Sequence, residues 1–158
     1  MCLQAFADCD SITVPLTLNK TLHLVQQTFA DNQQDLALIE RTDTLTTAVH
    51  RITFGGRKSI ESRACSLQLL ALQKGGHWGW HVLWQERDNL FYLRVDSEAW
   101  VSSPPKKIAQ LVTGDVKFSI NQETLTVNWQ QIEQGLIAYL QAISNDEGRS
   151  WNLMPNQP

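Results

Sequence analysis

The sequence predicts a single α+β domain, in which an N-terminal and a C-terminal helix pack against an antiparallel sheet of roughly five to seven strands. Apolar residues recur at helical spacing near both ends of the chain, and the region between them alternates apolar and polar residues. A length of 158 residues, with 42% hydrophobic and 18% charged side chains, suits one globular domain. We expect residues 1–145 to form this domain and residues 146–158 to be a loosely ordered polar tail.

Helical periodicity predicts the helices. The first covers residues 16–30, where Leu18, Leu22, Val25 and Phe29 share one helical face. A short helix is predicted over residues 105–112, because proline is favoured at the first helical position. The last helix covers residues 129–144 and is capped by Asn128. The side chains expected on its buried side are Trp129, Ile132, Leu136, Tyr139, Leu140 and Ile143.

Period-two alternation predicts the strands between the helices. Tight turns between consecutive strands favour antiparallel pairing. The clearest hairpin has Glu86-Arg87-Asp88-Asn89 as its loop. A helix is the weaker alternative for residues 60–73. The predicted strands are 36–40, 45–54, 60–73, 77–85, 90–95, 116–120 and 124–127.

Charge and cysteine usage limit the classes of function. The formal net charge of -3 offers no overall attraction to nucleic acid or acidic membranes, although residues 51–74 are locally basic. Cys2, Cys9 and Cys65 match no zinc-ligand spacing and are expected to be free thiols. The first residues show no charged stretch followed by an apolar one, so we expect no leader segment, and no apolar run is long enough for a membrane span. These features predict a cytoplasmic protein without a cofactor.

The segment His77-Trp78-Gly79-Trp80-His81 is the most distinctive feature of the chain. In a strand, Trp78, Trp80 and Trp84 share one face, whereas His77 and His81 lie on the other. The two histidines are then roughly 13 Å apart, too far for one metal ion, and no metal site is predicted. The indoles either form core or, where exposed, provide a stacking surface or an interaction hot spot.

Basic residues beside glycines form the other candidate surface. Gly55-Gly56-Arg57-Lys58 and Lys74-Gly75-Gly76 are turns that place cations next to free backbone N–H groups, without matching a phosphate-binding motif. Lys106 and Lys107 follow Pro104-Pro105. We therefore expect a binding surface composed of Arg57, Lys58, Lys74, Trp78, Trp80, Lys106 and Lys107.

No catalytic residue can be assigned from the sequence. There is no nucleophile on a strand-to-helix elbow, and His50 lies on an apolar strand face that suggests a core position. Asp96 and Glu98 form an acidic pair at the end of a strand, where carboxylates are usually just exposed. An alternative pocket would combine His77, His81 and Cys65 at the mouth of the predicted hairpin of residues 77–95.

The sequence thus predicts a non-enzymatic binding or accessory protein, a small subunit or adaptor that recognises a macromolecular partner. A protein partner is favoured over nucleic acid because the net charge is negative. This protein partner could itself be part of a nucleoprotein complex. The alternative is a small enzyme or small-ligand-binding protein that uses the pocket at the hairpin. No membrane partner is expected.

Overall fold

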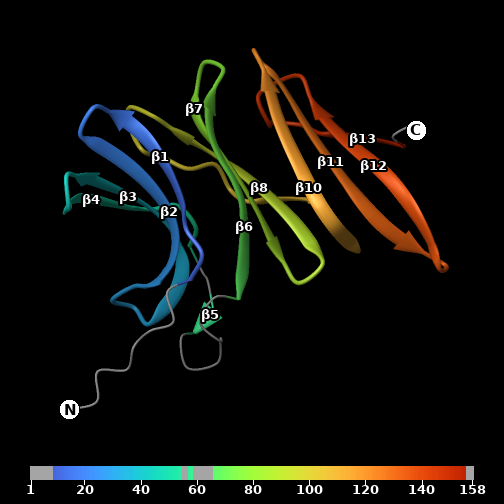
Figure 1. Ribbon diagram of the computed structural model, residues 1–158, viewed down its shortest axis with the longest axis horizontal. Coiled ribbons are helices and arrows are strands. Elements are labelled where there is room, and N and C mark those ends of the chain that lie inside the picture. The colour runs from blue at the N-terminus through green and yellow to red at the C-terminus, as the bar shows by residue number, and fades with distance from the viewer. Residues whose placement is uncertain (1–8, 55–56, 59–65, 156–158) are drawn as a thin grey trace.

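The computed structural model describes residues 9–54, 57–58 and 66–155 of the chain. Every regular element in these ranges is a β-strand, and the strands form three antiparallel sheets. The α+β class predicted from the sequence is therefore wrong, and so is the single sheet covered by helices. Figure 1 shows the three sheets in chain order, from the N-terminal sheet in blue to the C-terminal sheet in orange and red.

Each sheet is made of strands that are consecutive along the chain. The first sheet contains β1 (Ile12–Thr17), β2 (Lys20–Thr28), β3 (Gln33–Thr42) and β4 (Leu45–Arg51), and the short β5 (Arg57–Lys58) also pairs with β3. The second contains β6 (Leu67–Gly75), β7 (Gly79–Glu86), β8 (Asn89–Asp96) and β9 (Lys106–Ala109). The third contains β10 (Val112–Asn121), β11 (Thr124–Glu133), β12 (Leu136–Ser144) and β13 (Asn152–Pro155).

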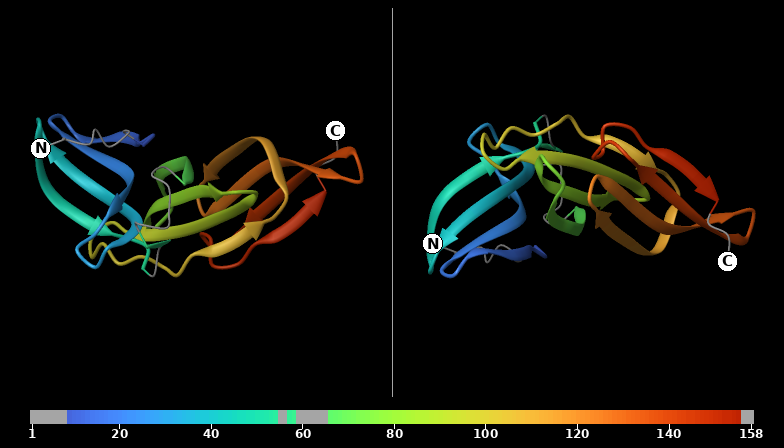
Figure 2. Two further views of the ribbon diagram at one scale, coloured as in Figure 1. Left: turned by 90° about the horizontal axis from the view of Figure 1, so that it is seen from below. Right: turned by 90° about the horizontal axis from the view of Figure 1, so that it is seen from above.

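In each sheet, the four main strands follow one another in an up-and-down order. Figure 2 shows from two opposite sides that the sheets follow one another along the long axis. The first strand of the second sheet, β6, contacts β1 and β2 on one side and β10 on the other. The second sheet is therefore the centre of the fold.

Two hydrophobic cores hold the sheets together. One lies between the first and second sheets, and the other between the second and third. The second sheet supplies both cores, because alternate residues of β7 point to opposite faces: Val82 to the first core and Leu83 to the second. Both side chains are buried. This explains why β7 reads as a nearly continuous apolar run.

The predicted N-terminal helix over residues 16–30 is replaced by the β1–β2 hairpin. Its helical spacing depends on Leu18, which is fully exposed at the turn between the strands. The buried residues of β2 are Leu22 and Leu24, which alternate with half-buried His23 and Val25. The burial of side chains in this segment therefore alternates with a period of two residues, as in a strand. The helical spacing arose because apolar residues lie on both faces of that strand.

The predicted C-terminal helix over residues 129–144 is replaced by strands β11 and β12. Gln134 and Gly135 form the turn, with φ angles of 51° and 80°. Two successive residues with positive φ form the type of hairpin turn that suits the twist of a sheet, and they end any helix. Ile132 pairs with Ile137 across this turn, and both side chains are exposed on the outer face of the third sheet.

The remaining predicted helix also differs from expectation, and part of the C-terminal segment forms a strand. Residues 105–112 contain strand β9, a turn at residues 110–111 and the start of β10, instead of a helix. Within the segment expected to be a loose tail, Asn152–Pro155 pairs with β12 as strand β13. The hairpin predicted over residues 77–95 is confirmed as β7 and β8.

Two further expectations concern the cysteines and the membrane. Cys9 is disulfide-bonded, so the prediction of a free thiol is wrong for this residue. Cys2 and Cys65 lie outside the described residues. Among the described ranges there is no helix that is long and apolar enough to cross a membrane.

Candidate functional site

Three turns meet at one end of the molecule, where the second and third sheets adjoin. They are the β6–β7 turn (residues 76–78), the β10–β11 turn (residues 122–123) and the β12–β13 loop (residues 145–151), which we call the turn cluster. In Figure 1 they lie at the top. The cluster gathers residues that are far apart in the sequence: the backbone N–H of Glu147 donates to the carbonyl oxygen of Glu123 at 3.2 Å.

The β6–β7 turn is shaped by glycine. Gly79 has a φ of 126°, and a Cβ atom there would come within 2.7 Å of the Val95 carbonyl oxygen. Only glycine therefore lets the start of β7 lie so close to β8. Trp78, immediately before this point, is 42% exposed, whereas Trp80 is 5% exposed and Trp84 4% exposed in the first core. Trp80 and Trp84 thus share the apolar face predicted for them, and Trp78 lies outside it.

The β12–β13 loop is held by side-chain hydrogen bonds to its own backbone. Ser144 Oγ donates to Asp146 Oδ1 at 2.8 Å and accepts from the Gly148 N–H at 2.7 Å. Asp146 also accepts from the Ser150 N–H and hydroxyl, at 2.8 and 2.6 Å. Burial raises the pKa of Asp146, but the hydrogen bonds from Ser150 and Ser144 outweigh it and lower the pKa to about 2. The carboxylate is therefore a structural part of a rigid loop.

His81 and Tyr92 form a buried polar pair below the turn cluster. His81 is 0% exposed; its Nε2 atom lies 3.1 Å from the Gly75 carbonyl oxygen and its Nδ1 atom 2.7 Å from the Tyr92 hydroxyl. Burial lowers the pKa of His81 and raises that of Tyr92, so both side chains are neutral at pH 7. Nε2 is within hydrogen-bond distance of the Gly75 carbonyl oxygen and Nδ1 of the Tyr92 hydroxyl, so neither ring nitrogen is free for acid–base chemistry.

Glu147 connects this pair to the surface. Its carbonyl oxygen accepts from the Tyr92 hydroxyl at 3.1 Å, and its side chain is 4% exposed. The carboxylate oxygen Oε1 accepts from the His77 backbone N–H at 2.5 Å and lies 3.4 Å from His77 Nδ1. Glu123 Oε1 lies 3.0 Å from the same ring nitrogen. An imidazole thus sits between two carboxylates, one buried and one exposed.

Two arginines lie close to the ring of Trp78. The guanidinium carbons of Arg94, from β8, and of Arg149, from the β12–β13 loop, are each 5.1 Å from the centroid of the Trp78 ring, within cation–π distance. Trp78 and Arg94 also line a cavity of about 230 Å³. The other lining residues are Asp96, Val101, Ser102 and Ser103.

Neither guanidinium forms an ion pair with a carboxylate of the described residues. Asp96 lines the same cavity, but its Oδ1 atom accepts from the backbone N–H groups of Glu98 and Ala99 at 2.8 and 2.9 Å. These hydrogen bonds lower the pKa of Asp96 and hold its carboxylate in its own turn. Arg94 Nη1 is buried without a hydrogen-bond partner in the described structure.

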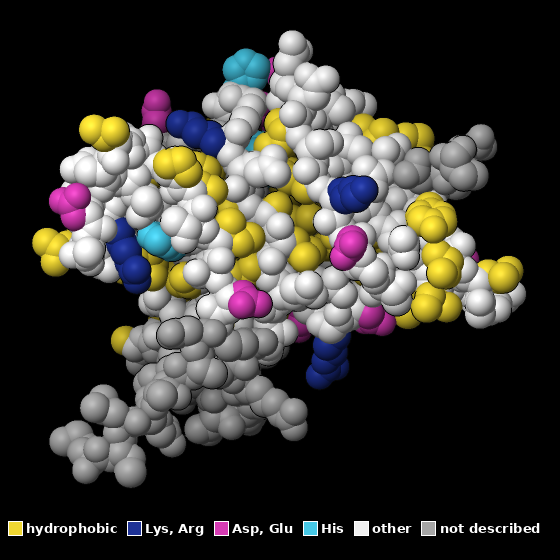
Figure 3. Space-filling view, viewed as in Figure 1, with side chains coloured by type: hydrophobic (Ala, Val, Ile, Leu, Met, Phe, Trp, Pro, Cys, Tyr) yellow, Lys and Arg dark blue, Asp and Glu magenta, His cyan; other side chains and the backbone are white. Residues whose placement is uncertain are grey.

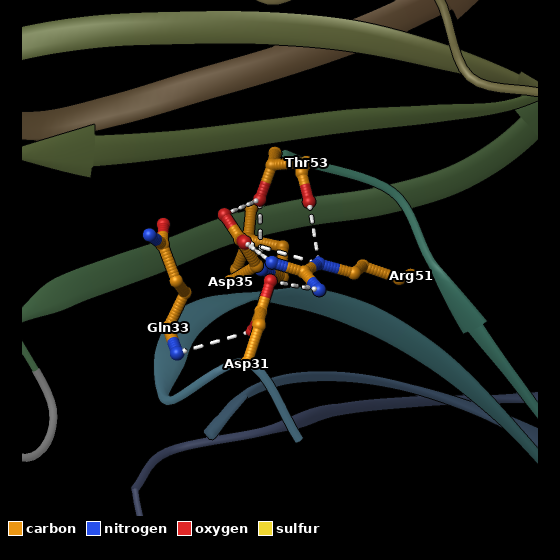
Figure 4. A network of polar contacts seen from close by, with 6 residues as sticks. Asp31, Gln33, Asp35, Arg51 and Thr53 are labelled. Carbon is orange, nitrogen blue, oxygen red and sulfur yellow. Dashed lines mark hydrogen bonds and ion pairs between the residues drawn. The ribbon is translucent and has the colours of Figure 1, made fainter. Parts of the chain in front are cut away.

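The first sheet contains a different kind of ionic cluster. Figure 4 shows Arg51 between Asp31 and Asp35, with Thr53 completing the network. Arg51 Nη2 lies 2.5 Å from Asp35 Oδ2, and Nη1 lies 2.9 Å from Asp31 Oδ2. Hydrogen bonds to Asp35 and Asp31 raise the pKa of Arg51. Because its charge is already paired, this arginine has a structural role.

The remaining residues predicted for the binding surface are dispersed. Lys74 is exposed on β6, and Lys106 and Lys107 are exposed on the edge strand β9. No hydrogen bond, ion pair or ring contact of the described structure connects these lysines to Trp78. Arg57 and Lys58 form β5, and their side chains lie outside the description, as does Cys65 of the alternative pocket.

Sequence reasoning missed the residues that complete the turn cluster. Arg94 lies on β8, Glu123 in the β10–β11 turn, and Glu147 and Arg149 in the β12–β13 loop, and pattern analysis could not bring these three segments together. One signal was present in the sequence. Turn-forming residues occupy every second position of this segment, which indicates a loop held by its own side chains: Ser144, Asp146, Gly148 and Ser150.

A second surface feature lies on the third sheet. Exposed apolar side chains gather at the far end of the β11–β12 hairpin and on β13, where Figure 3 shows hydrophobic atoms at the surface. A groove of about 480 Å³ between β9 and this sheet is lined by Trp129, Leu140, Leu153 and Met154, among others. The exposed apolar residues are Ile132, Leu136, Ile137, Tyr139, Leu153 and Met154.

Comparison of the chain with protein-family models, with curated proteins and with solved structures found no match.

Proposed function

We propose that this chain is a non-enzymatic binding protein that recognises an acidic group of a partner protein at Trp78, beside Arg94 and Arg149. The observation that carries the proposal is the position of two guanidinium groups, each 5.1 Å from the ring centroid of one exposed indole. We call these three residues the Trp78 surface.

The charges of this surface favour an anionic ligand. Neither guanidinium group has a carboxylate partner among the described residues, so each can accept an incoming carboxylate as its counter-ion. Arginine can bind a carboxylate through two parallel N–H groups, which gives direction as well as strength. The Nη1 atom of Arg94 is buried without a hydrogen-bond partner in the described structure, so one donor of this guanidinium is unsatisfied there.

The size of the surface favours a protein over a nucleic acid. A cavity of about 230 Å³ admits an acidic side chain or a chain terminus. Two cations provide a much smaller footprint than the roughly 6–10 phosphate contacts typical of salt-sensitive nucleic-acid binding.

The chemistry of the turn cluster supports binding over catalysis. His81, a member of the alternative pocket, is buried and uses both ring nitrogens in hydrogen bonds. His77 is exposed and lies between two carboxylates. Neither arrangement places a nucleophile next to a free base, which nucleophilic catalysis requires.

Isothermal titration calorimetry with an acetylated and amidated hexaglutamate peptide tests this proposal. We expect the wild-type chain to bind it and the variants Arg149→Gln and Trp78→Leu to lose most of the affinity. Both residues are exposed, so the fold should survive. Arg41→Gln, an exposed arginine on β3 of the first sheet, is the matched control and should bind as the wild type does.

Two outcomes would contradict the proposal. In one, the Arg149→Gln and Trp78→Leu variants bind hexaglutamate as tightly as the wild type, or the wild type does not bind it at all. In the other, a single-stranded DNA oligonucleotide binds far more tightly than hexaglutamate and the binding weakens steeply with salt, which would indicate a nucleic-acid partner.

A further inference from the structure

Three potential metal ligands converge within the turn cluster, one from each turn. His77 Nδ1 and one carboxylate oxygen each of Glu123 and Glu147 all lie within 4.8 Å of one another. The nitrogen is 3.0 Å from Glu123 Oε1 and 3.4 Å from Glu147 Oε1. In a tetrahedral zinc site, metal–ligand bonds of about 2.0–2.1 Å place the ligand atoms about 3.3 Å apart. The observed separations are close to that value.

The burial of Glu147 points to a missing positive charge. Its side chain is 4% exposed, and its Oε2 atom is buried without a hydrogen-bond partner among the described residues. A buried carboxylate with an unsatisfied oxygen is costly unless a cation or a donor compensates it. His77 alone compensates it poorly, because its side chain is 76% exposed and its nitrogen is closer to Glu123.

The backbone holds both glutamates in place for a shared ligand. The Glu147 N–H donates to the Glu123 carbonyl oxygen at 3.2 Å, and the Glu147 carbonyl oxygen accepts from Tyr92. Gly76 leaves room for the carboxylate: a Cβ atom there would overlap Glu147 Oε1 at 1.9 Å. These backbone contacts and the space at Gly76 thus hold the Glu147 carboxylate against the β6–β7 turn, which preorganises the site.

We propose that His77, Glu123 and Glu147 bind a divalent transition-metal ion, of which Zn²⁺ is the representative. An imidazole nitrogen with two carboxylate oxygens suits zinc and its neighbours, whereas Ca²⁺ prefers ligand sets made of oxygen alone. The exposed side of His77 leaves the fourth position to water.

Such an ion would connect the second and third sheets. His77 belongs to the second sheet, whereas Glu123 and Glu147 belong to two turns of the third. Because the ligands come together only in the folded chain, binding of the ion would stabilise the fold by mass action. The site is independent of the Trp78 surface, whose residues contribute no metal ligand.

The test is isothermal titration calorimetry of the metal-free full chain with ZnCl₂ at neutral pH, together with thermal unfolding with and without the metal. We expect one ion per chain and a higher unfolding temperature in its presence. His77→Gln and Glu123→Gln should each weaken binding by at least about tenfold, the loss typical even of indirect partners of a metal. Both side chains are exposed, at 76% and 56%, so these variants should fold.

Glu133→Gln is the matched control, because Glu133 is an exposed acid of the same third sheet outside the cluster, and it should bind zinc as the wild type does. Three results would overturn the proposal: no zinc binding by the wild type at submillimolar metal, equal binding by the His77→Gln and Glu123→Gln variants, or tighter binding of Ca²⁺ than of Zn²⁺. Hexaglutamate binding by the His77→Gln variant should be retained, which separates this proposal from the function of the Trp78 surface.

Discussion

The side chain of Tyr92, on the second sheet, reaches the backbone carbonyl oxygen of Glu147, on the loop of the third sheet, at 3.1 Å. Tyr92 also packs edge-on against Trp151 with a centroid distance of 5.0 Å. Because Glu147 lies two residues before Arg149 and contacts His77, this hydrogen bond helps to hold the β12–β13 loop beside both candidate sites.

Replacing Tyr92 by phenylalanine should therefore destabilise the chain. The substitution keeps the ring in the core but removes the hydroxyl that donates to the Glu147 carbonyl oxygen and lies 2.7 Å from His81 Nδ1. Leaving buried groups unsatisfied costs about 1–3 kcal/mol. Urea denaturation measures the change. Tyr139→Phe is the control, since Tyr139 is 52% exposed and should change stability by less than about 0.5 kcal/mol. Equal effects of the two substitutions would contradict the contact.

The burial of His81 predicts that stability falls in mild acid. Burial lowers its pKa in the folded chain from the ordinary value of 6.5, although the Gly75 hydrogen bond and Glu147 partly oppose this shift. On acidification the unfolded chain binds the proton first, so stability is full above pH 6.5 and is lost as the pH falls toward the lower folded-state pKa.

Denaturation midpoints measured across this pH range should show the decline in the wild type and a flatter profile for His81→Gln. His23, whose pKa burial also lowers, titrates in the same direction but is more accessible. The His23→Gln variant should retain most of the slope. A profile that is unchanged in His81→Gln would show that other groups cause it.

Two glycines with similar backbone angles offer a matched pair. A Cβ atom at Gly148, where φ is 87°, would lie 2.1 Å from the Tyr92 hydroxyl, whereas a Cβ atom at Gly135, where φ is 80°, would meet nothing within 4 Å. Gly135→Ala should cost only the left-handed backbone penalty of about 1–2 kcal/mol. Gly148→Ala should cost clearly more, as measured by chemical denaturation. The reverse order would mean that the β12–β13 loop does not pack on Tyr92.

The tryptophans at positions 78 and 80 should respond differently to removal. Trp80 is 5% exposed in the first core, and Trp80→Ala should lower the free energy of unfolding by about 3–5 kcal/mol. Trp78→Ala should lower it by only about 1 kcal/mol, because the exposed ring loses little more than its contacts with two arginines. Similar losses for both variants would place Trp78 in a core.

The strands and the hairpin of residues 77–95 could be predicted because their alternation and their turn residues agree with each other. The same kind of pattern did not exclude the helices that were wrongly predicted. β2 has apolar side chains on both faces, with Leu22 and Leu24 buried in the core and Val25 half-buried on the opposite face. Apolar residues at offsets of three and four then occur without a helix. Only the turn at Leu18 distinguishes a β-hairpin from a helix in this segment.

The C-terminal hairpin shows the same difficulty at a turn. Gln134-Gly135 is a weaker turn signal than Asn-Gly, although it adopts the same positive φ angles. Ile132, Leu136, Tyr139 and Leu140 imitate one helical face, but the turn places them on two strands whose outer face is exposed.

The candidate sites depend on contacts between distant segments, which local patterns do not encode. The sequence indicated Trp78 as a residue of interest, and the separation of His77 from His81 argued against a metal site formed by that pair. The candidate site at Trp78 is completed by Arg94 and Arg149, which are distant in sequence. The candidate metal site at His77 is completed by Glu123 and Glu147. His77 and Glu147 are 70 residues apart in the chain.

The central claim is that an acidic partner binds at the Trp78 surface, and the most direct test follows the indole N–H signals of the six tryptophans by two-dimensional NMR during a titration with hexaglutamate. The Trp78→Phe spectrum assigns the signal of Trp78. We expect this signal to shift with saturation, the signals of buried Trp80 and Trp84 to stay in place, and the shift to disappear in Arg149→Gln. A titration in which the Trp78 signal does not move, or moves equally in Arg149→Gln, would contradict the claim.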